Sequence, residues 1–188
     1  MEQMTPSRLA TPADAEEIAA LVNRAYRPAA CERTWTHEAD LIAGERIAVE
    51  QVRTLFRPQS RVLLQCRASA ILACVHLEIV GAVAHIGMLA TRPDVQAQGL
   101  GKHMLAQAER HAHQYFRVES FEISVLTART ELLSFYERRG YVRTGRRLPY
   151  PADSGTGQPL REDIELELLS KTAHRNLYAK VVDGRHPA

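Results

Sequence analysis

Residues 96–102 carry the strongest chemical signal in this sequence. They read Gln-Ala-Gln-Gly-Leu-Gly-Lys, after an apolar run at 83–90 and before an amphipathic run that begins at Leu100. A strand that leads through glycines into a helix directs several backbone N–H groups at one point, where the helix dipole adds partial positive charge. Gly99 and Gly101 have no Cβ, so a ligand can touch the backbone. The segment therefore predicts an anion site that suits phosphate.

A second motif follows at residues 126–141, which read Leu-Thr-Ala-Arg-Thr-Glu-Leu-Leu-Ser-Phe-Tyr-Glu-Arg-Arg-Gly-Tyr. The first motif, Gln-x-x-Gly-x-Gly, is neither the dinucleotide fingerprint nor the P-loop. Together the two segments resemble the GNAT superfamily of N-acetyltransferases. In that family the glycine loop holds the pyrophosphate of coenzyme A, and a later helix carries a tyrosine and ends in a Gly-Tyr or Gly-Phe step. The resemblance covers about residues 8–169 and is strongest over 86–141.

The resemblance implies direct attack of an amine on acetyl-CoA. In the family, the strand before the glycine loop separates from the next strand, and the pantetheine arm pairs with the exposed strand edge. The N–H of Leu89 would then stabilise the oxyanion, and the loop amides would take the pyrophosphate. The family often has an asparagine where Arg129 stands, so this arginine either reaches a phosphate or makes no contact. The expected cofactor contacts are Leu89, Ala90, Thr91, Gln96, Ala97, Gln98, Gly99, Leu100, Gly101, Lys102 and Arg129.

The same resemblance implies three catalytic candidates. Tyr136 matches the family's tyrosine and would protonate the leaving thiolate as a general acid, or it only packs on the sheet. His85 stands four residues before Leu89, where related histone acetyltransferases place a glutamate base. It is expected to share the side-chain parity of Leu89, and imidazole titrates near neutral pH. Glu78 is the alternative base, acting through water; if neither residue serves, both belong to the scaffold.

The amine is expected to bind between residues 26–46 and 147–160, which supply substrate contacts in the family. Tyr26, Trp35, Glu38 and Asp40 would form an aromatic and acidic pocket for an ammonium group. The alternative is a solvated helical segment anchored by the tryptophan. Some small-molecule GNAT enzymes have a similar Trp-Thr-x-Glu stretch followed by Leu and Gly-x-Arg, which does not identify their substrate.

The elements that must position these residues alternate between strands and helices. Apolar periodicity and turn signals predict a mixed α/β sheet of the GNAT type, in the order β-α-α-β-β-β-α-β-α-β-β. Predicted strands cover residues 7–10, 62–66, 71–79, 82–90, 121–126, 141–146 and 164–169. Predicted helices cover residues 12–26, 48–56, 99–116 and 130–139, with a short additional helix at 36–42. A loop rich in proline and glycine is expected at 149–159.

Composition narrows the class of protein. The 188 residues are 45% apolar with a net charge of +2, which predicts one domain at residues 1–170 and a polar tail at 171–188. The charge gives no support for bulk nucleic-acid binding. The apolar stretches are too short and interrupted for a membrane span. Three cysteines without a C-x-x-C spacing and no secretory signal favour the cytoplasm, and no metal-ligand spacing appears.

The sequence as a whole predicts an acetyl-CoA-dependent N-acetyltransferase that acts on a small-molecule primary amine. Its expected partners are acetyl-CoA and that amine, with a homodimer left open. One alternative is acetylation of a protein lysine or N-terminus. The alternative of another class is a coenzyme A-binding sensor or interaction module without turnover.

Overall fold

The computed structural model describes residues 7–28 and 37–173 of the chain. The strands are Arg8–Leu9 (β1), Ile42–Ala43 (β2), Ser60–Arg67 (β3), Ala70–Val80 (β4), Val83–Thr91 (β5), Ser120–Leu126 (β6), Val142–Pro149 (β7), Gln158–Pro159 (β8) and Glu165–Thr172 (β9). The α-helices are Ala15–Tyr26 (α1), Val49–Arg53 (α2), Leu100–Phe116 (α3) and Thr130–Glu137 (α4). Short 3₁₀ turns lie at Pro12–Asp14 (η1), Pro93–Val95 (η2) and Ala152–Ser154 (η3).

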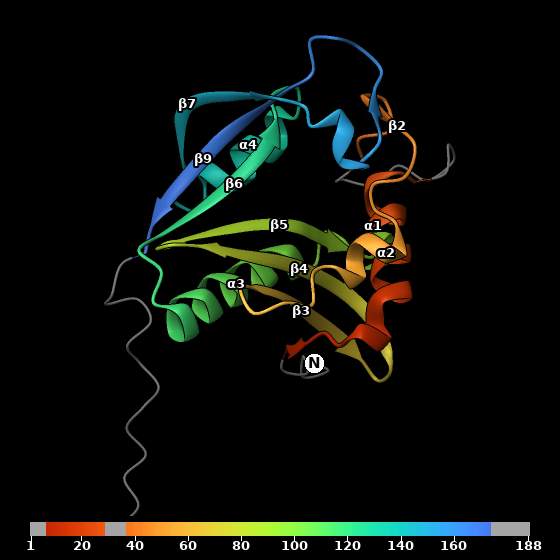
Figure 1. The fold of residues 1–188 in the computed structure, drawn as a ribbon, viewed down its shortest axis with the longest axis vertical. Helices are drawn as coiled ribbons and strands as arrows, with labels where there is room; N and C mark the ends of the chain where they lie inside the picture. The colour runs from red at the N-terminus through yellow and green to blue at the C-terminus, as the bar shows by residue number, and fades with distance from the viewer. Residues whose placement is uncertain (1–6, 29–36, 174–188) are drawn as a thin grey trace, which may run out of the picture.

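Seven strands form one mixed sheet in the order β1-β3-β4-β5-β6-β9-β7 (Figure 1). Only the central pair, β5 and β6, is parallel. This confirms the predicted mixed α/β fold, and the main elements follow one another in the predicted order. The sequence does not predict β2 and β8, which pair with each other as a separate two-stranded sheet.

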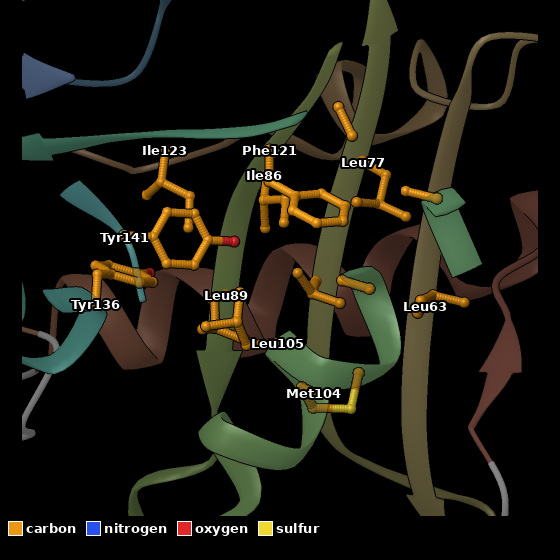
Figure 2. Packing of buried hydrophobic residues seen from close by; sticks show 14 of the residues in the cluster. Leu63, Leu77, Ile86, Leu89, Met104, Leu105, Phe121, Ile123, Tyr136 and Tyr141 are labelled. Atoms are coloured by element: carbon orange, nitrogen blue, oxygen red, sulfur yellow. The ribbon is translucent and has the colours of Figure 1, made fainter. Parts of the chain in front are cut away.

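The sheet carries a hydrophobic core on each face. On one face, Met104 and Leu105 of α3 and Leu133 of α4 pack against alternate strand residues (Figure 2). On the other face, Ile18 and Val22 of α1 belong to a second cluster. Both helices thus bury the apolar stripe that their spacing predicts. The two cores hold β3, β4 and β5 as a rigid layer.

The feature that creates the site is the separation of β5 from β6. Their parallel pairing covers only residues 83–85 of β5 and 120–122 of β6, and the two strands diverge beyond it (Figure 1). Helix α3 connects them and begins where β5 has ended. The far half of β5 therefore has no β6 partner among the described residues, as the GNAT resemblance implies.

Two predicted helices differ from the structure. The helix expected at 36–42 is wrong for its described part: the N–H groups of Leu41 and Ile42 both donate to the Glu38 carbonyl, closing a turn that leads into β2. Pairing of Ile42 with Pro159 of β8 overrides the local helical pattern. The helix expected at 48–56 is shorter, because α2 ends at Arg53.

The C-terminal boundary lies slightly later than residue 170, since β9 runs to Thr172. Lys171 Nζ lies 2.6 Å from Glu109 Oε2, and the Tyr141 hydroxyl donates to Glu109 Oε1 at 2.9 Å. This buried pair ties the end of β9 to α3. Within residues 7–28 and 37–173, no helix is long and apolar enough to cross a membrane.

Candidate active site

The glycine loop forms one wall of a cavity of about 540 Å³. Eight of the predicted cofactor contacts line it: Leu89, Thr91, Gln96, Ala97, Gly99, Leu100, Gly101 and Lys102. The opposite wall comes from α4, with Leu132, Phe135, Tyr136 and Arg139. We call this space the cofactor cavity.

The loop has the geometry that its sequence predicts. Gly99 caps α3 with a φ of +79°, a left-handed conformation that glycine adopts without strain. The first helical hydrogen bond runs from His103 N to Gly99 O at 3.0 Å. The N–H groups of Leu100, Gly101 and Lys102 precede it and therefore have no acceptor within the helix. They are available to an anion at the positive end of α3.

Three predicted cofactor contacts lie elsewhere. Gln98 and Ala90 are absent from the lining of the cofactor cavity, and the Ala90 side chain packs in the core beside α1. Arg129 is also absent from it. Its Nη1 donates to the carbonyl of His37 at 2.5 Å, and its Nε donates to Glu131 at 2.5 Å. This buried guanidinium holds the segment at residue 37 in place of reaching a phosphate.

Arg139 is a cavity residue that sequence reasoning missed. Its guanidinium stacks 3.4 Å from the centroid of the Phe135 ring. Burial and the neighbouring Arg138 lower its pKa, and its buried Nε has no hydrogen-bond partner in the described part of the chain. A positive group with an unused donor at a cavity wall fits an anionic ligand. No local pattern in the sequence separates it from the other arginines nearby.

A second cavity of about 260 Å³ adjoins the first. Its charged and titratable lining residues are Glu38, Arg46, His76, Glu78, His85 and Glu122. We call it the acceptor cavity. Four residues line both cavities, namely Tyr26, Leu89, Leu132 and Tyr136. The two spaces therefore meet at these side chains.

A bulge in β5 shapes the meeting point. The pairing with β4 jumps from Gly87 to Ala90, and Met88 has a φ of +49°. The extra residue reverses the alternation of side chains: Ile86 and Leu89 pack with α3, whereas Met88 packs with α1. The expected shared parity of His85 and Leu89 is therefore wrong, and their side chains leave opposite faces of β5.

His85 has a partner that the sequence analysis did not identify. It pairs with Glu122 across the parallel β5–β6 ladder, and its Nδ1 lies 3.5 Å from Glu122 Oε2. Both side chains line the acceptor cavity. Apolar neighbours at Phe121 and Ile123 already indicate that Glu122 faces away from the core. Which strand it lies beside depends on long-range pairing that no local pattern shows.

Glu78, the alternative base, is already paired. Both of its carboxylate oxygens accept hydrogen bonds from Arg57, at 2.8 and 2.6 Å. Burial, reinforced by Arg57, lowers the pKa of the neighbouring His76 to about 4, so this imidazole is neutral at pH 7. His76 Nε2 also lies 2.8 Å from Ser60 Oγ. The geometry thus leaves His85 and Glu122 as the more available acid–base pair.

Tyr136 stands at the junction of the two cavities. It contacts Phe135 and Tyr141 edge-on and lies beside Leu89 (Figure 2). Burial raises the pKa of its phenol, so the hydroxyl keeps its proton at neutral pH. On the other side, the Tyr26 hydroxyl donates to the Leu89 carbonyl at 3.1 Å, and burial raises its pKa as well. A proton donor and a clamped strand backbone thus meet at one place.

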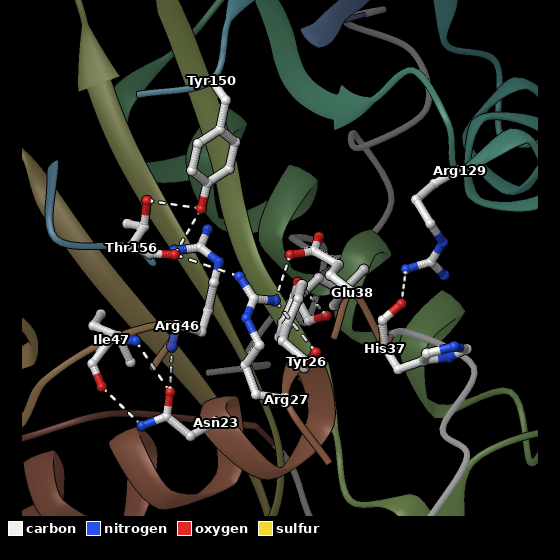
Figure 3. A network of polar contacts seen from close by, with 11 residues as sticks. Asn23, Tyr26, Arg27, His37, Glu38, Arg46, Ile47, Arg129, Tyr150 and Thr156 are labelled. Atoms are coloured by element: carbon white, nitrogen blue, oxygen red, sulfur yellow. Dashed lines mark hydrogen bonds and ion pairs between the residues drawn. The ribbon is translucent and has the colours of Figure 1, made fainter. Parts of the chain in front are cut away.

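A polar network closes the acceptor cavity (Figure 3). Arg27 Nη1 lies 2.8 Å from Glu38 Oε2, and its Nη2 donates to Thr156 O at 3.4 Å. The Tyr150 hydroxyl donates to the same carbonyl at 2.6 Å. These contacts bind the end of α1 to the segment at 38 and to the loop before β8. The loops expected to bind substrate therefore lie together.

The predicted acceptor pocket is reproduced in part. Tyr26 and Glu38 line the acceptor cavity. Asp40 does not line it, since its side chain is 84% exposed and pairs with His37. Trp35 lies outside the described residues. Among those that are described, no cluster of three or more His, Cys, Asp or Glu side chains could hold a metal ion.

Comparison with known proteins gives a family and a fold. Residues 32–149 match the family model of the acetyltransferase (GNAT) domain. No curated protein matches the sequence. An N-acetyltransferase from Staphylococcus aureus Mu50 superposes with a TM-score of 0.69 at 14% identity, over 91% of this chain and 99% of that one.

Two further solved structures have named substrates. The ribosomal-protein-S18-alanine N-acetyltransferase of Escherichia coli gives a TM-score of 0.66 at 14% identity, covering 92% of this chain and 98% of that chain. Mutant forms of the spermidine/spermine N-acetyltransferase SpeG of Vibrio cholerae give a TM-score of 0.63 at 14% identity, covering 94% of this chain and 97% of that chain. At this identity the likeness concerns the fold.

Proposed function

The chain belongs to the GNAT family of acetyl-CoA-dependent acetyltransferases, and on this premise we propose that it acetylates a primary amine of a small molecule by direct attack. One observation carries the proposal: the cofactor cavity and the acceptor cavity meet at Leu89 and Tyr136. A thioester and an amine that enter from opposite sides would come into contact there. Holding both reactants in one place converts a bimolecular reaction into an effectively unimolecular one.

The residues of the cofactor cavity fit coenzyme A. The unused amides of Leu100, Gly101 and Lys102 suit its pyrophosphate, and the unused Nε of Arg139 suits a further phosphate oxygen. The half of β5 that has no β6 partner among the described residues offers that edge to the pantetheine arm. Leu89, clamped by Tyr26, would direct its N–H at the charge that develops on the thioester oxygen.

Proton transfer falls to two residues on opposite sides of this point. His85 would accept the proton of the incoming ammonium, and Glu122 would hold the imidazole and stabilise its charged form. Tyr136, protonated because it is buried, would donate to the leaving thiolate. We do not assign the base to Glu78, because Arg57 occupies both of its oxygens.

The small volume of the acceptor cavity, about 260 Å³, favours a small molecule over a protein acceptor. Glu38 and Thr156, both bound by Arg27, belong to its lining. The E. coli neighbour acts on a ribosomal protein and the V. cholerae one on polyamines, so the family allows either class. A non-catalytic sensor is the weaker alternative, because Tyr136 and both loop glycines are present. The cytoplasmic location and the homodimer stay predictions from the sequence.

The direct experiment is a thiol-release assay with acetyl-CoA and a panel of amines, with product mass measured in parallel. Amines can first be ranked by the thermal shift they produce in the presence of coenzyme A. An acetylated amine and stoichiometric free thiol are expected. Coenzyme A binding without thiol release for any amine or peptide would favour the sensor, and acetylation of peptides alone would favour a protein acceptor.

A further inference from the structure

The acceptor cavity contains two carboxylates that are already neutralised. Glu38 is bound by Arg27 at 2.8 Å. Glu78 is bound by Arg57 through two hydrogen bonds. Each of these ion pairs is complete without a ligand, so neither carboxylate is left to balance a charge on the acceptor.

Two opposite charges in the same lining are not matched by a fixed partner. Among residues 7–28 and 37–173, the Glu122 carboxylate has one ion-pair partner, the imidazole of His85 at 3.5 Å. Arg46 has no ion pair and no side-chain hydrogen bond within the described part of the chain, where its guanidinium lies over the Tyr26 ring. His76 is neutral at pH 7, because burial lowers its pKa to about 4. The unmatched lining therefore has one negative and one positive position, supplied by β6 and by the segment between β2 and α2.

Arg46 is held in place before any ligand binds. Its backbone N–H donates to Asn23 Oδ1 at 2.7 Å, and Ile47 exchanges two hydrogen bonds with the same side chain, at 3.1 and 2.8 Å. Its guanidinium carbon lies 5.5 Å from the centroid of the Tyr26 ring. Figure 3 shows this side chain extending from the clamped backbone toward Tyr150. A guanidinium that extends from an anchored backbone into a cavity and stacks on a ring suits a carboxylate.

Tyr26 also fixes the distance from this cation to the chemistry. Its hydroxyl binds Leu89 O at 3.1 Å, while its ring carries Arg46. The same tyrosine thus contacts both the strand at the junction where the amine would attack and the Arg46 guanidinium. A carboxylate bound there would belong to a molecule whose amine and carboxylate are separated by a short chain.

We propose that Arg46 binds a carboxylate of the acceptor, so that the substrate is a small amino acid whose amine lies toward His85 and Glu122. The proposal rests on the acetyltransferase function above and names the substrate class of the same site. It also assigns a role to the arginine of the Gly44-x-Arg46 segment, which the catalytic residues leave unused. A free amino acid supplies the negative and positive groups that the unmatched lining would balance.

The test compares matched acceptors on the wild type and on Arg46→Gln. Leucine and phenylalanine are each assayed beside their carboxamide and the decarboxylated amine. In the wild type, the amino acid should have the highest kcat/KM. In Arg46→Gln, kcat/KM for the amino acid should fall about 10- to 100-fold through KM, the scale of a charged hydrogen bond. The values for the carboxamide and the amine should stay near those of the wild type.

Arg53→Gln is the matched control, because Arg53 lies on the exposed side of neighbouring α2 and pairs with Glu50. Arg53→Gln removes the same charge and should leave the preference for the amino acid over its carboxamide and amine intact. Arg46→Lys, which keeps the charge, should retain part of it. The intrinsic reactivities of the three amines cancel when each variant is compared with the wild type.

Three results would overturn the proposal: no turnover of either amino acid, a wild type that prefers the carboxamide or the amine, or a preference that survives Arg46→Gln. If the carboxamide or the decarboxylated amine is acetylated in the same assay, the acetyltransferase function stands even though the amino acid is rejected as the substrate. If the wild type releases no thiol with any acceptor, both the amino-acid substrate and the proposed acetyltransferase function are contradicted. No other result in this series contradicts the proposed function.

Discussion

The cofactor cavity and the acceptor cavity adjoin each other, but they are built in different ways. The cofactor cavity takes its anion site from residues that are contiguous in the chain, 96–102, and uses their backbone. The acceptor cavity is assembled from side chains that lie far apart in sequence, from Tyr26 to Leu166. The anion site of the cofactor cavity depends on a turn and a helix start, whereas the acceptor cavity depends on the tertiary fold.

Because of this difference, the two cavities should tolerate different kinds of substitution. A backbone site is disturbed by adding atoms, since the ligand must approach the main chain. A side-chain site is disturbed by removing or exchanging a functional group. A glycine substitution in the cofactor cavity should therefore abolish coenzyme A binding. Substitutions in the acceptor cavity should instead change the rate, pH profile or specificity of acetyl transfer and leave coenzyme A binding intact.

The largest effect is expected from Gly101→Asp. Gly101 lies in the first turn of α3, and a Cβ there would meet only Phe135 Cζ at 4.0 Å. The fold should therefore survive, while a carboxylate beside the phosphates repels them. Calorimetry should show loss of detectable coenzyme A binding with an unchanged far-ultraviolet circular dichroism spectrum.

Gly101→Ala is the control for this variant. It adds the Cβ without the charge and should weaken binding less. If Gly101→Asp binds coenzyme A as tightly as the wild type does, the phosphate site is not at this loop.

The next effect concerns Tyr136, which the two cavities share. Tyr136→Phe keeps the buried ring and removes the proton donor. The rate of acetyl transfer should fall about 10- to 10⁴-fold, the range for general acid catalysis, while the affinity for acetyl-CoA changes little. Single-turnover rates together with calorimetry give both quantities. A Phe variant with full activity would show that the thiolate leaves without this phenol.

A smaller and more specific effect is expected in the acceptor cavity at His85. If His85 is the base, the rate should rise with pH to a plateau, because only the neutral imidazole can accept a proton from the amine. His85→Gln should remove that inflection and lower the rate. Glu122→Gln should lower the rate less than His85→Gln does, because it removes only the carboxylate that lies 3.5 Å from the ring.

Glu78→Gln is the comparison within this pH series. Loss of the inflection in that variant, with its survival in His85→Gln, would transfer the base to Glu78. An unchanged profile in all three variants would mean that the amine arrives already deprotonated.

The same contrast explains what the sequence could predict. Gly99 precedes the first residue of α3, as the sequence predicts for a strand that leads through glycines into a helix. The order of the main elements also follows the predicted one. These features depend on neighbours in sequence, and local glycine and helix-start signals specify them. The separation of β5 from β6 is implied only by the GNAT resemblance, because it depends on which strands pair across the sheet.

The acceptor cavity depends on contacts that local patterns do not contain. Glu122 reaches His85 only through the parallel pairing of β5 and β6. The backbone of Arg46, in the segment between β2 and α2, is positioned by Asn23 of α1. The short helix predicted at 36–42 is replaced by β2, since its partner β8 lies more than a hundred residues later. The bulge at Met88 likewise reverses a parity that simple alternation predicts.

The most direct test of the central claim is a crystal structure of the protein with acetyl-CoA. Our account places the pyrophosphate on the amides of residues 100–102 with Arg139 beside a phosphate. It places the thioester carbonyl at the Leu89 N–H and the sulfur within hydrogen-bond reach of the Tyr136 hydroxyl. A pyrophosphate bound away from α3, or a thioester that ends away from Tyr136, would contradict it.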